Sequence, residues 1–400
     1  MDPINDIRPF EGIRVLDITH VLAAPFATYQ LAVFGADVIK IENPHEPEQT
    51  RIDGSDPQLS ADNIGTHFII QNGGKRSLTL DLKTEQGREI LRKLVPGADI
   101  LVENFRPGAL KALGLGYEDL RKLNPRLIYA SMSAFGQDGP RGGQTGYDQV
   151  IQAVSGLMMV NGTADMVPMK VGTPAVDYST GAMGAFALAA ALFQRERTGI
   201  GQYIDLSMLD TALMLMGAHL TNYSRSGKEP KAGGNRHEFS TCGLYDTADG
   251  KLQIAAINLR QQARLWKALG HPELVKTNNG ERRKGADAER AILLPILLTK
   301  TAAEWEDWFQ DHHIPAARIW TLPETLAHAQ LESRDILHHY EDEPGIPGKI
   351  TAPKAAFKLD HGGARIDRPP PRLGEHNEEL LAELGYSTEE IANLRATGAI

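Results

Sequence analysis

The sequence of 400 residues predicts an α/β fold, a doubly wound parallel sheet with helices on both faces. Short apolar, β-branched runs alternate with segments of helical periodicity, beginning with a run over 13–18, a helical segment over 24–35 and a run over 37–42. The alternation continues, and runs that suit buried strands recur over 77–82, 99–104 and 127–136. A strand–helix–strand order of this kind implies right-handed parallel crossovers.

After about residue 220 the composition changes, which indicates a second, smaller domain. Residues 224–238 are polar and basic and contain Gly and Pro, a composition typical of a linker or a mobile loop. Residues 243–257 predict a hairpin that turns at 248–250. Helical segments follow at about 259–269, 286–299 and 302–312, so we expect a small α+β domain here.

The C-terminal tail predicts a Pro-rich approach followed by two helices. An amphipathic helix begins at about residue 375, and a short one follows the cap Ser387. We therefore divide the chain into a large domain whose first part covers 1–220, a small domain with linkers over 225–330, and a C-terminal return to the large domain over 335–400.

The composition excludes several classes of protein. The formal net charge of −9 argues against nucleic-acid binding, which needs a basic surface. A single cysteine, Cys242, excludes an intramolecular disulfide and a cysteine-based zinc site. The most apolar run, Phe186–Phe193, is too short to span a membrane, and the first residues do not resemble a signal peptide. We therefore expect a cytoplasmic protein that does not bind membranes.

Common catalytic and cofactor motifs are absent from the sequence. The turn after the first predicted strand reads THVLAAPF and lacks the G-x-G-x-x-G fingerprint, which disfavours a nicotinamide-dependent dehydrogenase. There is no Walker A sequence, no G-x-S-x-G and no HExxH. The 13 histidines show no ligand spacing, so we expect no metal site.

Positive charges and amides lie at the ends of several predicted strands. They are Lys40, Arg51, Lys75, Arg76, Lys83, Asn104 and Arg106. Ligands of open α/β sheets bind at the carboxyl ends of the strands, so this pattern indicates a phosphorylated ligand. The same charges are equally compatible with ordinary solvated side chains at loop edges, and the pattern alone leaves both interpretations open.

Six segments run in order from residue 12 to residue 388: GIRVLDITHVLAAPFATYQLAVFGADVIKIE, KRSLTLDLK, ENFRPGALKALGLGYEDLRKLNPRLIYASMSAFGQDGP, GYDQVIQAVSGLM, RTGIGQYIDLSMLDTAL and PPPRLGEHNEELLAELGYS. Together they resemble the class III CoA-transferase family, which contains formyl-CoA:oxalate transferase, carnitine CoA-transferase and α-methylacyl-CoA racemase. The resemblance implies a Rossmann-like large domain built from the N- and C-terminal parts, a small domain between them, and a homodimer of two interlocked, ring-shaped chains.

The resemblance also implies that coenzyme A binds as a thioester substrate, with a small carboxylic acid as the second substrate and no tightly bound cofactor. In the family, Asn43 corresponds to an arginine and Thr145 to a transferase lysine, so we expect part of the phosphate contact to come from Lys83 and Arg106. Carried over by position or as electrostatic neighbours, the candidate CoA contacts are His20, Leu22, Ala23, Lys40, Arg51, Lys75, Leu80, Lys83, Asn104, Phe105, Arg106, Tyr147 and Asp148.

Asp177 precedes a long helix rich in small residues and has two interpretations. Its local sequence indicates an N-cap, although Ser179 or Thr180 could cap the same helix. The resemblance implies instead that Asp177 is the catalytic carboxylate of a D-x-x-x-G segment, which attacks the acyl-CoA carbonyl. This nucleophile must be ionised. Free aspartate has a pKa of about 3.9, and we expect the helix N-terminus to favour the anion.

Acyl transfer also needs amide donors for the oxyanion of its tetrahedral intermediates. The candidates are Gly181 and the loop 232–237, in which Gly233 and Gly234 match a family loop that closes over the intermediate. By its sequence alone, this loop is also compatible with a flexible linker.

Tyr147 favours a transferase over a racemase. Family racemases place a histidine here, because moving an α-proton between two faces requires two acid/base groups, and a phenol is a poor base at neutral pH. The resemblance therefore implies a CoA-transferase for a di- or branched carboxylic acid such as succinate, mesaconate, citramalate, glutarate or itaconate. A racemase of the same family and a non-catalytic CoA-binding protein are the alternatives.

Overall fold

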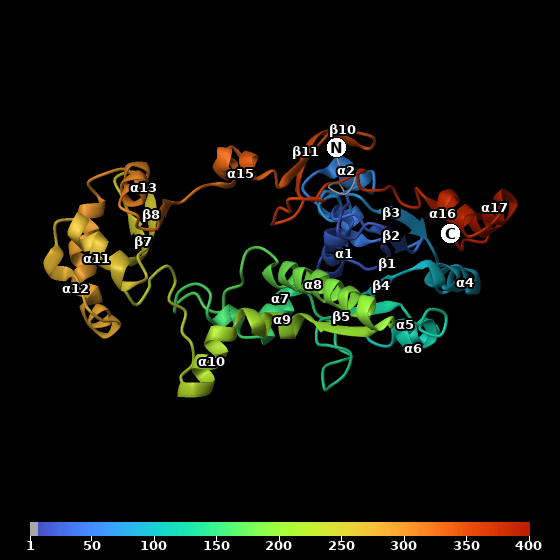
Figure 1. Cartoon of the computed structure of the whole chain (residues 1–400), viewed down its shortest axis with the longest axis horizontal. Helices are drawn as coiled ribbons and strands as arrows, with labels where there is room; N and C mark the ends of the chain where they lie inside the picture. Colours follow the sequence, from blue (N-terminus) through green and yellow to red (C-terminus); the bar gives the residue numbers. More distant parts are fainter. Residues whose placement is uncertain (1–6) are drawn as a thin grey trace. The chain divides into compact units, whose positions relative to one another are not determined.

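A six-stranded parallel sheet organises the larger part of the computed structural model, which describes residues 7–400 (Figure 1). The strands are β1 (Arg14–Ile18), β2 (Asp37–Glu42), β3 (Arg76–Thr79), β4 (Ile100–Glu103), β5 (Ile128–Ser133) and β6 (Tyr203–Ser207). Their spatial order is β3-β2-β1-β4-β5-β6. Because β1 pairs with both β2 and β4, the order reverses at β1, and such a switch point opens a crevice at the carboxyl ends of the strands.

Helices cover both faces of this sheet. The helices in this part of the chain are α1 (Ala23–Val33), α2 (Pro57–Ala61), α3 (Thr66–Ile69), α4 (Glu85–Leu94), α5 (Ala109–Ala112), α6 (Tyr117–Leu120), α7 (Asp148–Val154), α8 (Ala175–Thr198), α9 (Met208–Leu215), α10 (Gly217–Ser226), α15 (Ala329–Arg334), α16 (Asn377–Glu383) and α17 (Thr388–Ala396). Val15 and Ile100 point to the face covered by α1 and α8. Leu16 and Leu101 point to the opposite face, where α4, α6, α16 and α17 pack. The alternation of side chains along each strand thus builds two apolar layers.

By length and composition alone, α8 is also apolar enough to cross a membrane. In the structure, Leu188 and Ala191 of α8 are buried against α1 and the sheet. Arg195 near its C-terminal end forms an ion pair of 2.8 Å with Asp99. These contacts are those of a core helix in a globular unit.

The described residues form two compact units. The first contains the residues up to Leu157, Lys170–Lys228 and Gln330–Ile400, and the second contains Met158–Met169 and Glu229–Ala329. The sequence predicts that 158–169 belong to the large domain. The structure groups them with the second unit, where the Gly162 carbonyl accepts a hydrogen bond of 2.7 Å from the Gly234 amide.

The second unit combines a small antiparallel sheet with helices. Its strands are β7 (Cys242–Asp246), β8 (Lys251–Ala255) and β9 (Ala316–Arg318), and the predicted hairpin joins β7 and β8. Its helices are α11 (Leu259–Ala268), α12 (Asn279–Leu297), α13 (Ala302–Asp311) and α14 (Leu322–Leu326). α12 begins before the predicted residue 286 because the Asn278 side chain caps it, accepting from the Glu281 amide at 3.0 Å.

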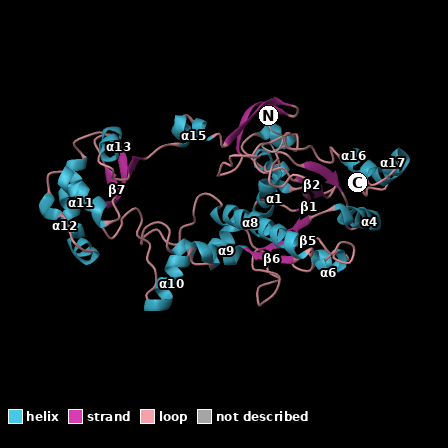
Figure 2. Cartoon of the chain, in the orientation of Figure 1, coloured by secondary structure: helices cyan, strands magenta, loops and turns pink. Residues whose placement is uncertain are grey.

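The predicted α/β fold with a parallel sheet is confirmed, but the prediction misses the 3-residue strand β9 and two longer strand features. The first is β6, an edge strand whose residues alternate between exposed and half-buried, so that it lacks a continuous apolar run. The second is the hairpin of β10 (Leu337–Glu343) and β11 (Ile346–Pro353), drawn in magenta in Figure 2. The sequence does not predict this hairpin because its second strand contains residues that are unfavourable in strands, namely Pro347, Gly348 and Pro353.

Candidate active site

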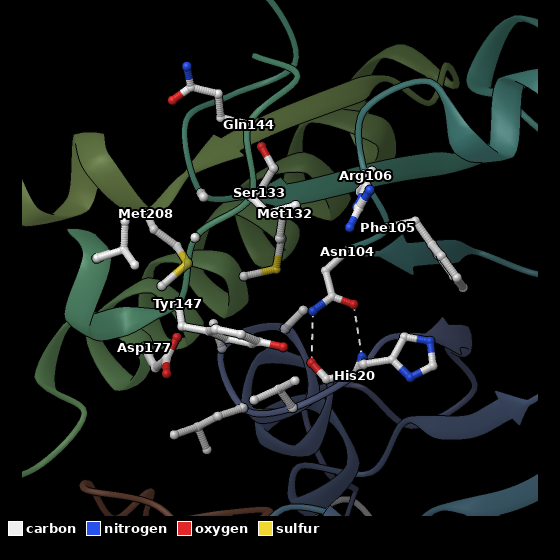
Figure 3. Close-up of a pocket in the computed structure, with 18 of the residues that line it drawn as sticks. His20, Asn104, Phe105, Arg106, Met132, Ser133, Gln144, Tyr147, Asp177 and Met208 are labelled. Atoms are coloured by element: carbon white, nitrogen blue, oxygen red, sulfur yellow. Dashed lines mark hydrogen bonds between the residues drawn. The ribbon is translucent and has the colours of Figure 1, made fainter. Parts of the chain in front are cut away.

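A cavity of about 500 Å³ opens at the carboxyl ends of β1, β4 and β5, where α1 and α8 begin (Figure 3). We call this cavity the strand-end pocket. Four separate segments of the chain, the start of α8 and Met208 meet here. The predicted site residues that line it are His20, Leu22, Ala23, Asn104, Phe105, Arg106, Tyr147 and Asp177.

Asn104 connects the two strands at the switch point. Its side-chain amide donates to the His20 carbonyl and accepts from the His20 amide, each at 2.8 Å, as the dashed lines in Figure 3 show. The rings of His20 and Phe105 meet edge to face with centroids 5.1 Å apart. Burial, and in second place the charge of Lys40, lower the pKa of His20, which favours the neutral form of its imidazole.

Asp177 is the third residue of α8, and Pro174 occupies the N-cap position. Its side chain lines the strand-end pocket and makes no hydrogen bond or ion pair with any of residues 7–400. The interpretation of Asp177 as an N-cap is therefore wrong, and so is capping by Ser179 or Thr180, because all three residues lie inside the helix. The structure thus leaves the Asp177 carboxyl group free for other chemistry.

Asp148 of α7 caps α8 instead. Its Oδ2 accepts hydrogen bonds from the backbone amides of Val176 (2.8 Å) and Asp177 (3.1 Å), which have no partner within the helix. Gln152 donates to the other oxygen of Asp148 and accepts from the Val171 amide at 2.9 Å. Asp148, predicted as a CoA contact, is 5% exposed and does not line the pocket, so the structure gives it the role of positioning α8.

Burial, and in second place the negative charge of Asp148, raise the pKa of Asp177 to about 7. This differs from the expectation that the helix N-terminus keeps Asp177 ionised. Asp177 is 8% exposed, and the loss of solvation together with a like charge outweighs the helix dipole. An ionised carboxylate whose conjugate acid has a pKa near 7 is more basic than an ordinary carboxylate, which favours attack on a carbonyl carbon.

Arg106 and Tyr147 lie at the exposed rim of the strand-end pocket. Tyr147 is 60% exposed, although it is a large aromatic side chain. Arg106 has no ion-pair partner within the part of the chain that the structure describes. The rim therefore offers an unpaired positive charge and an aromatic surface to an anionic ligand.

Three predicted phosphate-binding cations do not reach this pocket. Each is fully buried and neutralises a carboxylate of the large unit, so its charge is already used inside the fold. The pairs are Lys40–Glu48 (2.5 Å), Arg51–Glu42 (2.6 Å) and Lys75–Asp17 (2.8 Å).

Leu80 and Lys83 also lie outside the strand-end pocket. Leu80 is 1% exposed and belongs to the apolar layer under α4. The Lys83 side chain is exposed, with its Nζ atom 3.3 Å from Glu46 Oε2. Neither side chain points into the cavity that Asp177 lines.

The structure gives Gly181 a packing role in place of the predicted oxyanion contact. Its amide lies inside α8, where the helical hydrogen-bond pattern uses it. A Cβ atom at this position would lie 2.5 Å from the Ala23 carbonyl oxygen and 2.8 Å from the Phe26 ring, so glycine allows α8 to approach α1. Gly233 and Gly234, the other predicted donors, belong to the second unit, where Gly234 has a φ of +55°.

A comparison with models of protein families identifies the family of the chain that forms this pocket. The family model described as CoA-transferase family III matches residues 10–377. The chain belongs to CoA-transferase family III. It is therefore an enzyme of a class that uses CoA thioesters as substrates.

Known proteins resemble this family III CoA-transferase along nearly its whole length. The succinate–glutarate CoA-transferase of Agrobacterium fabrum is 38% identical over 394 residues, which cover 96% of this chain and 97% of that protein. The succinyl-CoA:mesaconate CoA-transferase of Haloarcula hispanica is 34% identical, with 94% and 97% covered. A solved CaiB/BaiF family structure from Brucella suis is 32% identical with a TM-score of 0.80, covering 95% of this chain and all of that one. Rv3272 from Mycobacterium tuberculosis is 31% identical with a TM-score of 0.82, covering 94% and 99%.

Some residues of the transferase pocket are missing from the sequence prediction. Ser133 ends β5, so the strand-end rule that found Asn104 could also have found it. Met208 follows β6, a strand that the prediction misses. The remaining unpredicted residues carry no charge that would mark them, and they are Val21, Ala24, Pro107, Met132, Ala134, Gln144, Thr145, Gly146 and Val150.

Proposed function

We propose that this enzyme transfers CoA from an acyl-CoA donor to a dicarboxylic acid through a covalent intermediate on Asp177. The observation that carries the proposal is the buried, unpaired carboxyl group of Asp177 in a pocket lined by His20–Ala23 and Asn104–Arg106. The dicarboxylate class is supported by the names of the relatives, which include succinate–glutarate and succinyl-CoA:mesaconate CoA-transferases. Arg106 at the rim suits the phosphates of CoA.

In the first half-reaction, a carboxylate oxygen of Asp177 attacks the thioester carbonyl carbon of the donor. The new C–O bond forms, the C–S bond breaks, and CoA leaves as a thiolate, so Asp177 carries a mixed anhydride. The thiolate then attacks the aspartyl carbonyl carbon. The anhydride C–O bond breaks, the donor acid leaves as its carboxylate, and CoA is held as an aspartyl thioester.

In the second half-reaction, the carboxylate of the acceptor acid attacks the aspartyl thioester, which again releases CoA thiolate and leaves an anhydride. The thiolate attacks the acceptor carbonyl, forms the product acyl-CoA and restores the Asp177 carboxylate. Each intermediate stays activated, so the thioester energy is kept as long as water is excluded. The low exposure of Asp177 supports this requirement.

The direct test is trapping of the aspartyl thioester. The enzyme is incubated with succinyl-CoA, quenched with hydroxylamine, and digested for mass spectrometry. We expect a hydroxamate on the peptide that contains Asp177, and no adduct in Asp177→Ala. Asp210→Asn is a matched control, because Asp210 lies in the first turn of α9 outside the pocket lining and should leave the adduct unchanged. Normal CoA exchange by Asp177→Ala would refute the mechanism, and α-deuterium exchange in a branched acyl-CoA would favour a racemase.

We also propose that the enzyme is a homodimer. Large apolar side chains on α8, α9 and α10 are between 50% and 66% exposed, and they are Phe186, Phe193, Met214, Leu220 and Tyr223. Exposed apolar surface of this kind marks an interaction site in a globular protein. A second copy of the chain is the occupant that the family resemblance implies.

A further inference from the structure

Val21, at the wall of the strand-end pocket, has a backbone conformation that its side chain disfavours. Its φ is +72°, in the left-handed region, although valine is β-branched. Such a conformation is strained for a β-branched residue and persists only where the surrounding structure enforces it. Because His20 and Leu22 on either side also line the pocket, the strain is located where the ligand binds.

Two side chains hold both polar groups of the Val21 backbone. Glu48 Oε1 accepts a hydrogen bond of 2.6 Å from the Val21 amide, and Gln71 Nε2 donates to the Val21 carbonyl. Both side chains belong to residues that are 1% exposed. Neither residue lines the pocket, so each can affect a ligand only through the turn.

The Glu48 side chain is itself fixed by buried partners. Lys40 Nζ lies 2.5 Å from Glu48 Oε2 and donates to the Thr19 carbonyl at 2.6 Å. Thr50 Oγ1 donates to Glu48 Oε1 at 2.8 Å. The ion pair Lys40–Glu48 therefore holds the chain at Thr19 and at Val21, on both sides of His20.

The backbone conformation of Val21 determines where the first backbone amides of α1 lie in the strand-end pocket. Leu22 is the N-cap of α1 and has no side-chain hydrogen bond to the helix. Within residues 7–400, no hydrogen-bond acceptor faces the backbone amides of Leu22, Ala23 and Ala24, and all three residues line the strand-end pocket. These donors depend on the direction in which the chain leaves Val21.

We propose that Glu48 and Gln71 are positioning residues that hold Val21 in its left-handed conformation and so set the geometry of CoA binding in the strand-end pocket. This inference rests on the proposed function, because it takes CoA as the ligand. Without either contact, Val21 relaxes toward negative φ, and the segment from Leu22 to Ala24 turns away from the pocket. The role of the ion pair Lys40–Glu48 is then to hold the turn and not to bind phosphate.

The test is a double-mutant cycle on Gln71 and Val21 with free CoA as the probe, measured by titration calorimetry. Gln71→Leu removes the donor to the Val21 carbonyl, and we expect the Kd for CoA to rise about tenfold, which corresponds to about 1.4 kcal/mol. Gln71 is the better position for the test because truncation of Glu48 would leave the Lys40 charge unpaired in the interior.

Val21→Gly separates positioning from general damage. Glycine adopts positive φ at no steric cost, so in the Val21→Gly background Gln71→Leu should change the Kd by less than about threefold. A merely structural role of Gln71 would give the same loss in both backgrounds. Tyr29→Phe is the matched control, because it also removes one buried donor to a backbone carbonyl, that of Pro353 at 2.7 Å, away from the pocket lining.

Each result has one interpretation. If wild-type enzyme binds no CoA, the proposed function fails and this inference fails with it. If wild type binds CoA and Gln71→Leu binds it equally well, or if Val21→Gly leaves the Gln71→Leu loss unchanged, only the inference is overturned. Should Gln71→Leu not fold, Gln71→Met keeps a flexible side chain of similar volume, and the same cycle decides.

Discussion

The raised pKa of Asp177 makes the pH dependence of CoA transfer a test of its role. Burial and the charge of Asp148 raise this pKa to about 7, and only the ionised carboxylate can attack the thioester. We therefore expect kcat/KM to fall about tenfold per pH unit below pH 7 and to level off above it. Transfer from succinyl-CoA to glutarate, measured between pH 5 and pH 9, checks this. A flat profile from pH 5 to pH 8 would exclude Asp177 as the titrating nucleophile.

Asp148→Asn separates the two causes of this pKa. The amide keeps one oxygen for the Val176 and Asp177 amides but removes the negative charge beside Asp177. We expect the midpoint of the pH profile to move to lower pH. Because the cap of α8 is weakened, we also expect the free energy of unfolding to fall by about 1 kcal/mol. An unchanged midpoint in a folded variant would mean that desolvation alone raises the pKa of Asp177.

The same carboxyl group is expected to destabilise the fold at alkaline pH. The folded pKa of Asp177 is raised above the unfolded value, so the folded state binds the extra proton and the free energy of unfolding falls as the pH rises from about 4 to about 7. Asp177→Asn removes this cost and should increase the free energy of unfolding at pH 8, with an upper bound of about 4 kcal/mol. Chemical denaturation of wild type and Asp177→Asn at pH 8 and pH 5 checks this prediction. An equal change in the free energy of unfolding at both pH values would contradict the link between the pKa of Asp177 and stability.

Charged residues were the least predictable part of the site. Lys40 lies near the end of β2, Arg51 follows β2 and Lys75 directly precedes β3, yet each pairs with a buried carboxylate. Asp17 could have indicated one of these pairs, because a carboxylate inside the apolar run VLDI needs a buried cation to neutralise it. The uncharged amide Asn104 lines the pocket, as its place directly after β4 predicts, and its contact with CoA stays a prediction.

In the parallel sheet, the strands that are buried were predicted, and the half-exposed edge strand β6 was missed. β1, β2 and β4 are covered on both faces, so nearly every residue is buried and the run is visible in the sequence. β6 lies at the sheet edge, where Tyr203 and Asp205 are exposed, and its pairing with β5 is decided by contacts between distant segments. Because β6 was missed, Met208, which follows it and lines the pocket, was not predicted as a site residue.

The close contact of α1 and α8 makes Gly181 a sensitive position. Gly181→Ala places a Cβ atom 2.5 Å from the Ala23 carbonyl oxygen, and both helices begin at the pocket. We expect a loss of about 1–3 kcal/mol in the free energy of unfolding, together with a higher KM for acyl-CoA. Gly217→Ala in α10 is the control, because its Cβ atom would meet nothing within 4 Å. Wild-type stability of Gly181→Ala would contradict the packing role.

The division of the chain follows from contacts that the sequence shows only partly. The change of composition after residue 220 marks the start of the second unit near Glu229, and the C-terminal helices α16 and α17 complete an apolar layer of the first unit. Residues 158–169 join the second unit although no change of composition marks them. Their place depends on contacts such as that between Gly162 and Gly234, which pair segments far apart in the chain.

The exposed apolar surface of α8, α9 and α10 predicts how many copies of the chain assemble. In light scattering after size exclusion, we expect a mass of twice 43.7 kDa. Phe186→Asp combined with Met214→Asp should shift the protein toward the monomer, because both side chains are 66% exposed and would be buried against the second copy. Leu322→Asp, at a residue that is 70% exposed in α14, tests for a general effect of added charge and should leave the mass unchanged. A wild-type monomer would refute the proposed homodimer, and a dimer that survives both aspartates would place the interface elsewhere.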